Sequence, residues 1–260
     1  MYFYGSMSIS ILIFLLLISP QERQNYPLKN GRPTTKGIEK YVEDNSDALI
    51  REYQNFIGDT LHNIYIYTED LTANGYFDPR ELGRYYPNEI FITNREAFMA
   101  YELSALTKKG RDTILASNLF VKAAIFHELT HDYIYQLSTE MSQVENIHVN
   151  RAYQAFFRIY SNTNEMGSKF IEEGICEYVT AKMGEIISPR RPFKPKSFAD
   201  LSNEENSYNI YYKYSSQYLS KFLDTTGIKR GIKILLHNPP PSREEILNPE
   251  LFFARLEGIE

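Results

Sequence analysis

The chain has a single cysteine, no tryptophan and no strong excess of charge of either sign among its 260 residues. One cysteine, Cys176, cannot form an internal disulfide, so no disulfide framework holds this fold. The formal net charge is only −5, and basic residues gather nowhere except in 189–196, a connection punctuated by prolines. We therefore expect no nucleic-acid partner. No internal repeat is visible either, which favours one ordinary globular domain.

Long hydrophobic runs are also missing. The apolar segment Ser8–Ser19 covers about a dozen residues, too short to span a bilayer comfortably but typical of a signal-peptide core. We expect 1–20 to be a signal peptide or an uncleaved N-terminal anchor. The protein is then secreted or periplasmic, with no stable membrane span unless that segment is retained. A buried first helix is the alternative, because no Lys or Arg precedes the run and Pro20 and Gln21 offer no small-residue cleavage site.

The sequence contains one dense group of side chains that can bind metal or transfer protons, at 127–131. The chain reads His127-Glu128-Leu129-Thr130-His131 after an almost wholly apolar run over 118–126, which predicts a buried helix. Residues four apart lie one turn above each other, so both imidazoles can bind one metal ion, with Glu128 beside it as a general base. The alternative is a helix with two unrelated core or surface histidines. A catalytic zinc needs a third protein ligand, and the acidic segment 172–178 offers one.

Together these segments resemble the gluzincin metallopeptidases, the group that includes thermolysin and the zinc aminopeptidases. In that group a downstream helix carries Glu followed by Gly or Ala and then small or apolar residues, and this Glu is the third zinc ligand. The resemblance assigns that role to Glu173, followed here by Gly174, and implies one Zn²⁺ per chain. It also implies that Glu177 hydrogen-bonds a ligand histidine, which fixes the tautomer and orientation of the ring. It covers mainly 114–179.

Two features depart from the family pattern. Asp132, directly after the second histidine, is charged where most members have an uncharged residue. It can face away from the metal, because consecutive residues lie about 100° apart around a helix. The spacing from His131 to Glu173 is about twice the commonest one, and the expected helix over 144–160 fills it at little cost in closure entropy.

Other side chains compete for the metal. His148, inside the inserted helix, is the obvious rival to Glu173 as third ligand, although no supporting motif surrounds it. Glu172 is expected to point to another side of its helix as a solvated or ion-paired acid. Cys176 is expected to be a small buried apolar residue, with an extra thiolate contact to the metal as the alternative.

The remaining sequence predicts the α+β class. Amphipathic and alternating patterns predict a helix over 38–57, strands over 63–68 and 89–94, and helices over 207–226 and 228–236, the first of which Gly227 should end. Ser242 and Glu245 then form a capping box that opens a last helix. By resemblance, we expect one zincin-like domain over 21–260. It has a small mixed sheet in about 21–140 and a mainly helical lobe in about 141–260.

The resemblance also implies how substrate is handled. In the family an edge strand beside the cleft pairs with the substrate backbone, and the candidate is 87–92, with Ile90, Phe91 and Ile92 as substrate-binding residues. A tyrosine of the helical lobe often donates a hydrogen bond to the developing oxyanion. Tyr212 is assigned that role.

Tyr211 and Tyr214 are the alternative oxyanion donors. The predicted function is a zinc-dependent peptidase that hydrolyses peptides or proteins, with Glu128 as general base. A binding protein without turnover and a non-peptide zinc amidase are the alternatives.

Overall fold

The computed structural model describes residues 28–29, 32–33, 35–70, 82–94, 113–144, 161–183 and 193–257. Side chains are described in 35–70, 82–94, 121–141, 166–183 and 193–257. The expected signal segment and His148 lie outside these residues, as does the expected helix over 144–160 apart from its first residue. Across the described ranges, no helix combines the length and apolar character needed to cross a membrane.

A three-stranded mixed sheet forms one part of the molecule. Its strands are β3 (Tyr65–Glu69), β4 (Gly83–Tyr86) and β5 (Glu89–Thr93), in the order β3-β5-β4. Strand β5 runs parallel to β3 and antiparallel to β4. The short strands β1 (Leu28–Lys29) and β2 (Arg32–Pro33) form a separate antiparallel pair. The two predicted strands are therefore present as β3 and β5, whereas β4 was not predicted.

The position of β5 corrects one prediction. Strand β5 contains Ile90, Phe91 and Ile92 and was expected to be the edge strand that pairs with substrate. It lies in the centre of the sheet, with a neighbour on each side, and Ile90 and Ile92 are fully buried. A central strand has no unpaired backbone edge, so among the described strands the outer strand that packs against α4 is β4 instead.

Helices make up most of the rest, which gives the protein a broadly α+β fold. The long helices are α2 (Thr35–Ile57), α4 (Thr113–Val144) and α6 (Ser161–Lys182). The C-terminal helices are α7 (Phe198–Ser202), η3 (Glu204–Asn206), α8 (Ser207–Asn209), η4 (Ile210–Tyr214), α9 (Ser215–Thr226), α10 (Ile228–His237), α11 (Arg243–Leu247) and α12 (Pro249–Glu257). Two predicted signals are confirmed: Gly227 ends α9 at φ 78°, and Ser242 with Glu245 forms the capping box of α11.

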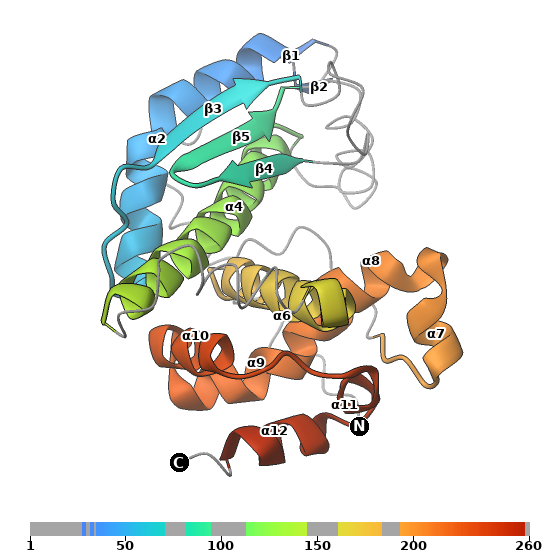
Figure 1. Cartoon of the computed structure of the whole chain (residues 1–260). Coiled ribbons are helices and arrows are strands. Elements are labelled where there is room, and N and C mark those ends of the chain that lie inside the picture. The colour runs from blue at the N-terminus through green and yellow to red at the C-terminus, as the bar shows by residue number, and fades with distance from the viewer. Residues whose placement is uncertain are drawn as a thin grey trace, which may run out of the picture.

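The layers follow from which side chains each element buries. Helices α2 and α4 pack against the sheet, and α6 lies between α4 and the C-terminal helices (Figure 1). Tyr53 of α2 and Phe126 of α4 are fully buried, with ring centroids 6.1 Å apart. On the other side, Phe170 of α6 contacts Tyr214 and Tyr218 of the C-terminal lobe. Helix α4 therefore lies between the sheet and the helical lobe, and α6 packs between α4 and the C-terminal helices.

Candidate metal centre

Helix α4 presents both motif histidines on one side. The rings of His127 and His131 have centroids 5.0 Å apart, as expected for residues one turn apart. Other positions of the same turns, Phe126, Leu129 and Thr130, are fully buried. This packing fixes the rotation of α4 about its own axis, so the direction in which the histidines point is set by the core.

Helix α6 brings Glu173 to the same point. Its Oε2 atom lies 3.2 Å from Nε2 of His127 and 4.0 Å from Nε2 of His131. The Nε2 atoms of both rings thus face one carboxylate oxygen. Two imidazole nitrogens and a carboxylate that converge in this way are a donor set that suits Zn²⁺.

The other ring nitrogens are also held by carboxylates. Nδ1 of His127 lies 3.5 Å from Oε1 of Glu177, where the family resemblance expects it. Nδ1 of His131 lies 2.8 Å from Oε1 of Glu172. The expectation that Glu172 points away from the site is therefore wrong. Neighbouring positions on α6 differ by about 100° in direction, which lets Glu172 and Glu173 approach different nitrogens of the pair.

The electrostatics of the cluster follow from this arrangement. Burial alone would lower the pKa of His127, but its hydrogen bonds with Glu173 and Glu177 outweigh burial and raise the pKa well above the ordinary value. The pKa of His131 is also raised, because the charge and hydrogen bond of Glu172 outweigh burial. Burial would raise the pKa of Glu173, yet the histidines hold it at about 2. Glu173 is therefore ionised at neutral pH in the metal-free protein, and both histidines would have to lose a proton to bind a metal ion.

Cys176 provides a second possible ligand set. One ligand atom from each of His127, His131 and Cys176 lies within 4.8 Å of the others. Burial raises the pKa of the Cys176 thiol well above its ordinary value, and the nearby acids raise it further. A thiol must lose its proton to bind metal, whereas Glu173 is already ionised. We therefore favour Glu173 as the third ligand, with Cys176 as a buried neighbour.

Strand β4 forms the opposite wall of the site. A Cβ atom placed on Gly83 would lie 2.7 Å from both Cγ and Oε1 of Glu128, so the strand backbone passes directly beside this acid. The ring of Tyr85 stacks on His131 with centroids 6.1 Å apart and planes at 13°. Gly83 and Tyr85 were not recognised in the sequence. Their two-residue spacing was the available signal, since it places both on one face of a strand.

Tyr212 comes from η4, a π-helical turn between α8 and α9. Its hydroxyl donates a hydrogen bond to Oε1 of Glu173 at 3.2 Å, and its ring centroid lies 6.2 Å from that of His127. Burial, followed by the charge of Glu173, raises the pKa of Tyr212, which keeps the hydroxyl protonated as a donor. Single π-helical turns within longer helices occur frequently at functional sites.

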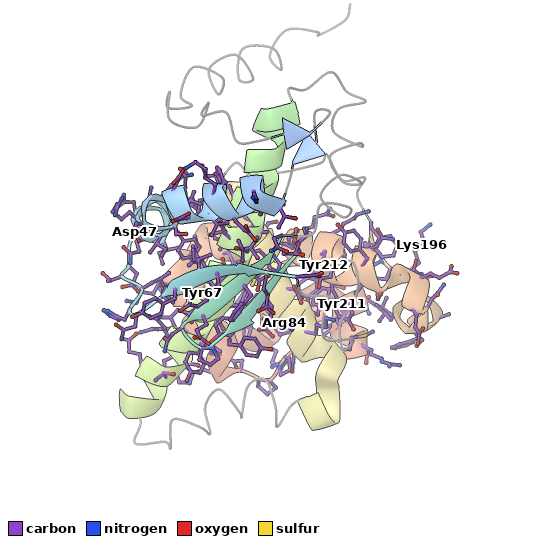
Figure 2. The ribbon with its side chains drawn as sticks, turned by 90° about the horizontal axis from the view of Figure 1, so that it is seen from above. Asp47, Tyr67, Arg84, Lys196, Tyr211 and Tyr212 are labelled. Carbon is purple, nitrogen blue, oxygen red and sulfur yellow. The ribbon has the colours of Figure 1, made fainter. Side chains whose placement is uncertain are left out.

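The alternative tyrosines have other contacts. The Tyr214 hydroxyl donates to the carbonyl oxygen of Ile246, which gives it a structural role. The Tyr211 ring lies 5.0 Å from Nζ of Lys169. Tyr211 and Tyr212 lie toward the α6 side of the sheet (Figure 2).

Asp132 faces away from the metal ligands, as its position on the helix allows. Its carboxylate accepts hydrogen bonds from the backbone N–H of Asn88 and from Nε2 of Gln136. Burial raises the pKa of Asp132 to about 6, although both hydrogen bonds oppose that shift. This departure from the family pattern therefore leaves the side of α4 that carries His127 and His131 unchanged.

Comparisons with known proteins offer no guide to the chemistry of this site. No family model matches the chain, and neither the curated proteins nor the solved structures contain a match to it. The function has to be inferred from the geometry of the site itself.

Proposed function

We propose that the protein is a zinc-dependent peptidase with a zincin-like fold, related in mechanism to the gluzincins. The observation that carries this proposal is the position of Glu173 Oε2, which faces Nε2 of both His127 and His131. Carboxylates at both Nδ1 atoms support it further, because zinc-bound histidines almost always donate their second N–H to such a partner. The apolar segment Ser8–Ser19 supports action outside the cytoplasm.

Each site residue has a distinct role in this proposal. His127, His131 and Glu173 would hold the metal, which when bound lowers the pKa of a water molecule and polarises the substrate carbonyl. Glu128, which is 8% exposed, takes the proton from the attacking water and holds it for the leaving amine. Tyr212 donates its hydroxyl to the oxygen on which negative charge develops. The products are a new carboxylate and a new amine.

Strand β4 is the best-placed element to bind an extended peptide. Among the described strands it pairs only with β5, and its inner face lies beside Glu128 and His131. A peptide added to this edge would gain main-chain hydrogen bonds and run past the general base. Gly83 allows this close approach of strand and acid, because a Cβ atom at that position would lie 2.7 Å from Cγ and Oε1 of Glu128.

The test is cleavage of a peptide library by the zinc-loaded protein and by its Glu128→Gln variant, with products identified by mass spectrometry. Gln keeps the shape of Glu but cannot accept the proton, so the variant should keep its zinc and its fold and lose turnover. Cleavage by the variant at the wild-type rate would contradict the mechanism. Hydrolysis of small amides alone would indicate an amidase, and zinc binding without any hydrolysis would indicate a binding protein.

A further inference from the structure

The turn between β4 and β5 is fastened to the metal-binding helix by one buried carboxylate. Asn88 lies in this turn with a positive φ of 69°, and its backbone N–H donates to Oδ1 of Asp132 at 2.9 Å. Asp132 is fully buried and immediately follows His131 on α4. Successive residues of one helix thus contact the metal site and the end of the strand beside it.

The second oxygen of Asp132 extends this connection. Nε2 of Gln136 donates to Oδ2 of Asp132 at 2.6 Å and also to the carbonyl oxygen of His62 at 3.1 Å, so both of its hydrogens are used. Oε1 of Gln136 accepts from the backbone N–H of His62 at 3.1 Å. These bonds fix the orientation of the amide. The segment before β3 and the turn after β4 are therefore held to one face of α4, an arrangement we call the Asp132 clamp.

A buried carboxylate is costly unless it gains specific partners, so its presence calls for a reason. Strand β4 is only four residues long and pairs with a single neighbour among the described strands. Besides that pairing, three contacts with α4 hold β4 next to the site. Gly83 packs beside Glu128, Tyr85 stacks on His131, and the Asp132 clamp holds the turn. The clamp supplies a hydrogen bond of defined direction from the turn to α4, and the carbonyl oxygen of Asn88 also accepts a hydrogen bond from the backbone N–H of Tyr65 at 3.0 Å.

We propose that Asp132 is a positioning residue that fixes β4, and a peptide paired to it, in register with the metal centre. This inference rests on the proposed peptidase function. A strand that shifts along its neighbour carries its bound peptide with it, so a different peptide bond comes to lie beside Glu128. Displacements of about 1 Å are enough to change turnover by about 100-fold.

Two substitutions of Asp132 distinguish the contributions of its two hydrogen bonds, one with Asn88 and one with Gln136. Asp132→Ala leaves the buried N–H of Asn88 and the amide of Gln136 without their acceptor. Asp132→Asn can still accept from Asn88, but its amide nitrogen then faces Nε2 of Gln136, and both groups are donors. The asparagine variant should therefore fall between the wild type and the alanine variant.

The first experiment measures kcat, KM, zinc content and the positions of cleavage for both variants. Asp132→Ala should keep its zinc, raise KM by about 10-fold and cleave at neighbouring bonds that the wild type leaves intact. Tyr178→Phe is the control, because it removes a hydrogen bond to Asp224, leaves the hydrogen bonds of the Asp132 clamp in place and should change only stability. A destabilised Asp132→Ala protein with unchanged KM and cleavage positions would overturn the proposal.

The second experiment does not depend on hydrolysis. Amide hydrogen exchange over 83–92 should be about 10-fold faster in Asp132→Ala than in the wild type and unchanged in Tyr178→Phe, while exchange in α6 is the same in Asp132→Ala as in the wild type. Unchanged exchange over 83–92 would refute the Asp132 clamp even if the protein is a peptidase. If the wild type cleaves no peptide, the proposed function and the substrate role of Asp132 both fail, and exchange still decides whether the clamp anchors β4.

Discussion

The two walls of the candidate metal centre are built in different ways. The helical wall, formed by α4 and α6, rests on fully buried side chains such as Phe126, Leu129 and Phe170. The strand wall is the four-residue strand β4, which pairs with one neighbour among the described strands and has a turn fastened by Asp132. The proposed metal ligands therefore lie on the densely packed wall, and the proposed substrate-binding edge lies on the wall with fewer contacts.

This difference has an energetic basis. Burial of one large apolar side chain contributes about 1.5–3 kcal/mol, and the helical wall has many of these. A single hydrogen bond contributes about 1 kcal/mol net, and the turn of β4 depends on few of these. We therefore expect changes on the helical wall to alter metal binding or chemistry, and changes on the strand wall to alter substrate binding while the metal stays in place.

The largest effect is expected from loss of a metal ligand on the helical wall. Glu173→Ala should lose most of its zinc, because two imidazoles alone bind zinc weakly. Cys176→Ala should keep the metal at about one zinc per chain if the thiol is only a buried neighbour. Metal analysis of both purified variants decides between the ligand sets. Zinc retained in the first variant and lost in the second would replace Glu173 by Cys176.

The next effect concerns chemistry rather than metal binding. Tyr212→Phe should lower kcat by about 100-fold, equivalent to about 2.7 kcal/mol, with little change in KM, because its hydroxyl would turn from Glu173 to the oxyanion only in the transition state. Tyr211→Phe is the matched control from the same π-helical turn and should have nearly normal kcat. Steady-state kinetics of the two variants provide the test. A normal kcat for Tyr212→Phe would remove this tyrosine from the mechanism.

A smaller effect is expected from the acids behind the histidines. Glu172→Gln should weaken zinc binding by about 10-fold, because the amide is a poorer partner for Nδ1 of His131. Glu177→Gln should weaken it less, since Glu177 lies 3.5 Å from His127 whereas Glu172 lies 2.8 Å from His131. Competition with a zinc chelator measures both affinities. Equal affinities in the two variants and the wild type would show that these carboxylates do not support the metal.

The smallest effect is expected on the strand wall. A loss of zinc there would contradict the division of roles between the two walls. A Cβ on Gly83 would lie 2.7 Å from Glu128, so Gly83→Ala must displace the acid or the strand. We expect kcat/KM to fall by about 5-fold with zinc content unchanged. Kinetics together with metal analysis provide the test. Loss of zinc in Gly83→Ala would mean that the strand wall also supports the metal.

Much of the site was predictable because the relevant geometry is local. The four-residue spacing of His127 and His131 places both rings on one side of any helix, whatever surrounds it. The capping box at Ser242 and the glycine at 227 depend only on neighbouring backbone, and both are present. The convergence of Glu173 on the histidines followed from family resemblance and not from local physics.

Strand order and helix crossing were decided by the tertiary structure alone. An alternating pattern identifies β5 as a strand, but whether it lies at an edge depends on where β4 pairs, and β4 carries no strong pattern of its own. The partner of Glu172 depends on how α6 crosses α4, which is set by packing. Asp132 and Asn88 are separated by 44 positions in the chain. A spacing along one helix fixes direction, whereas a contact between distant segments exists only once the whole core has fixed their relative positions.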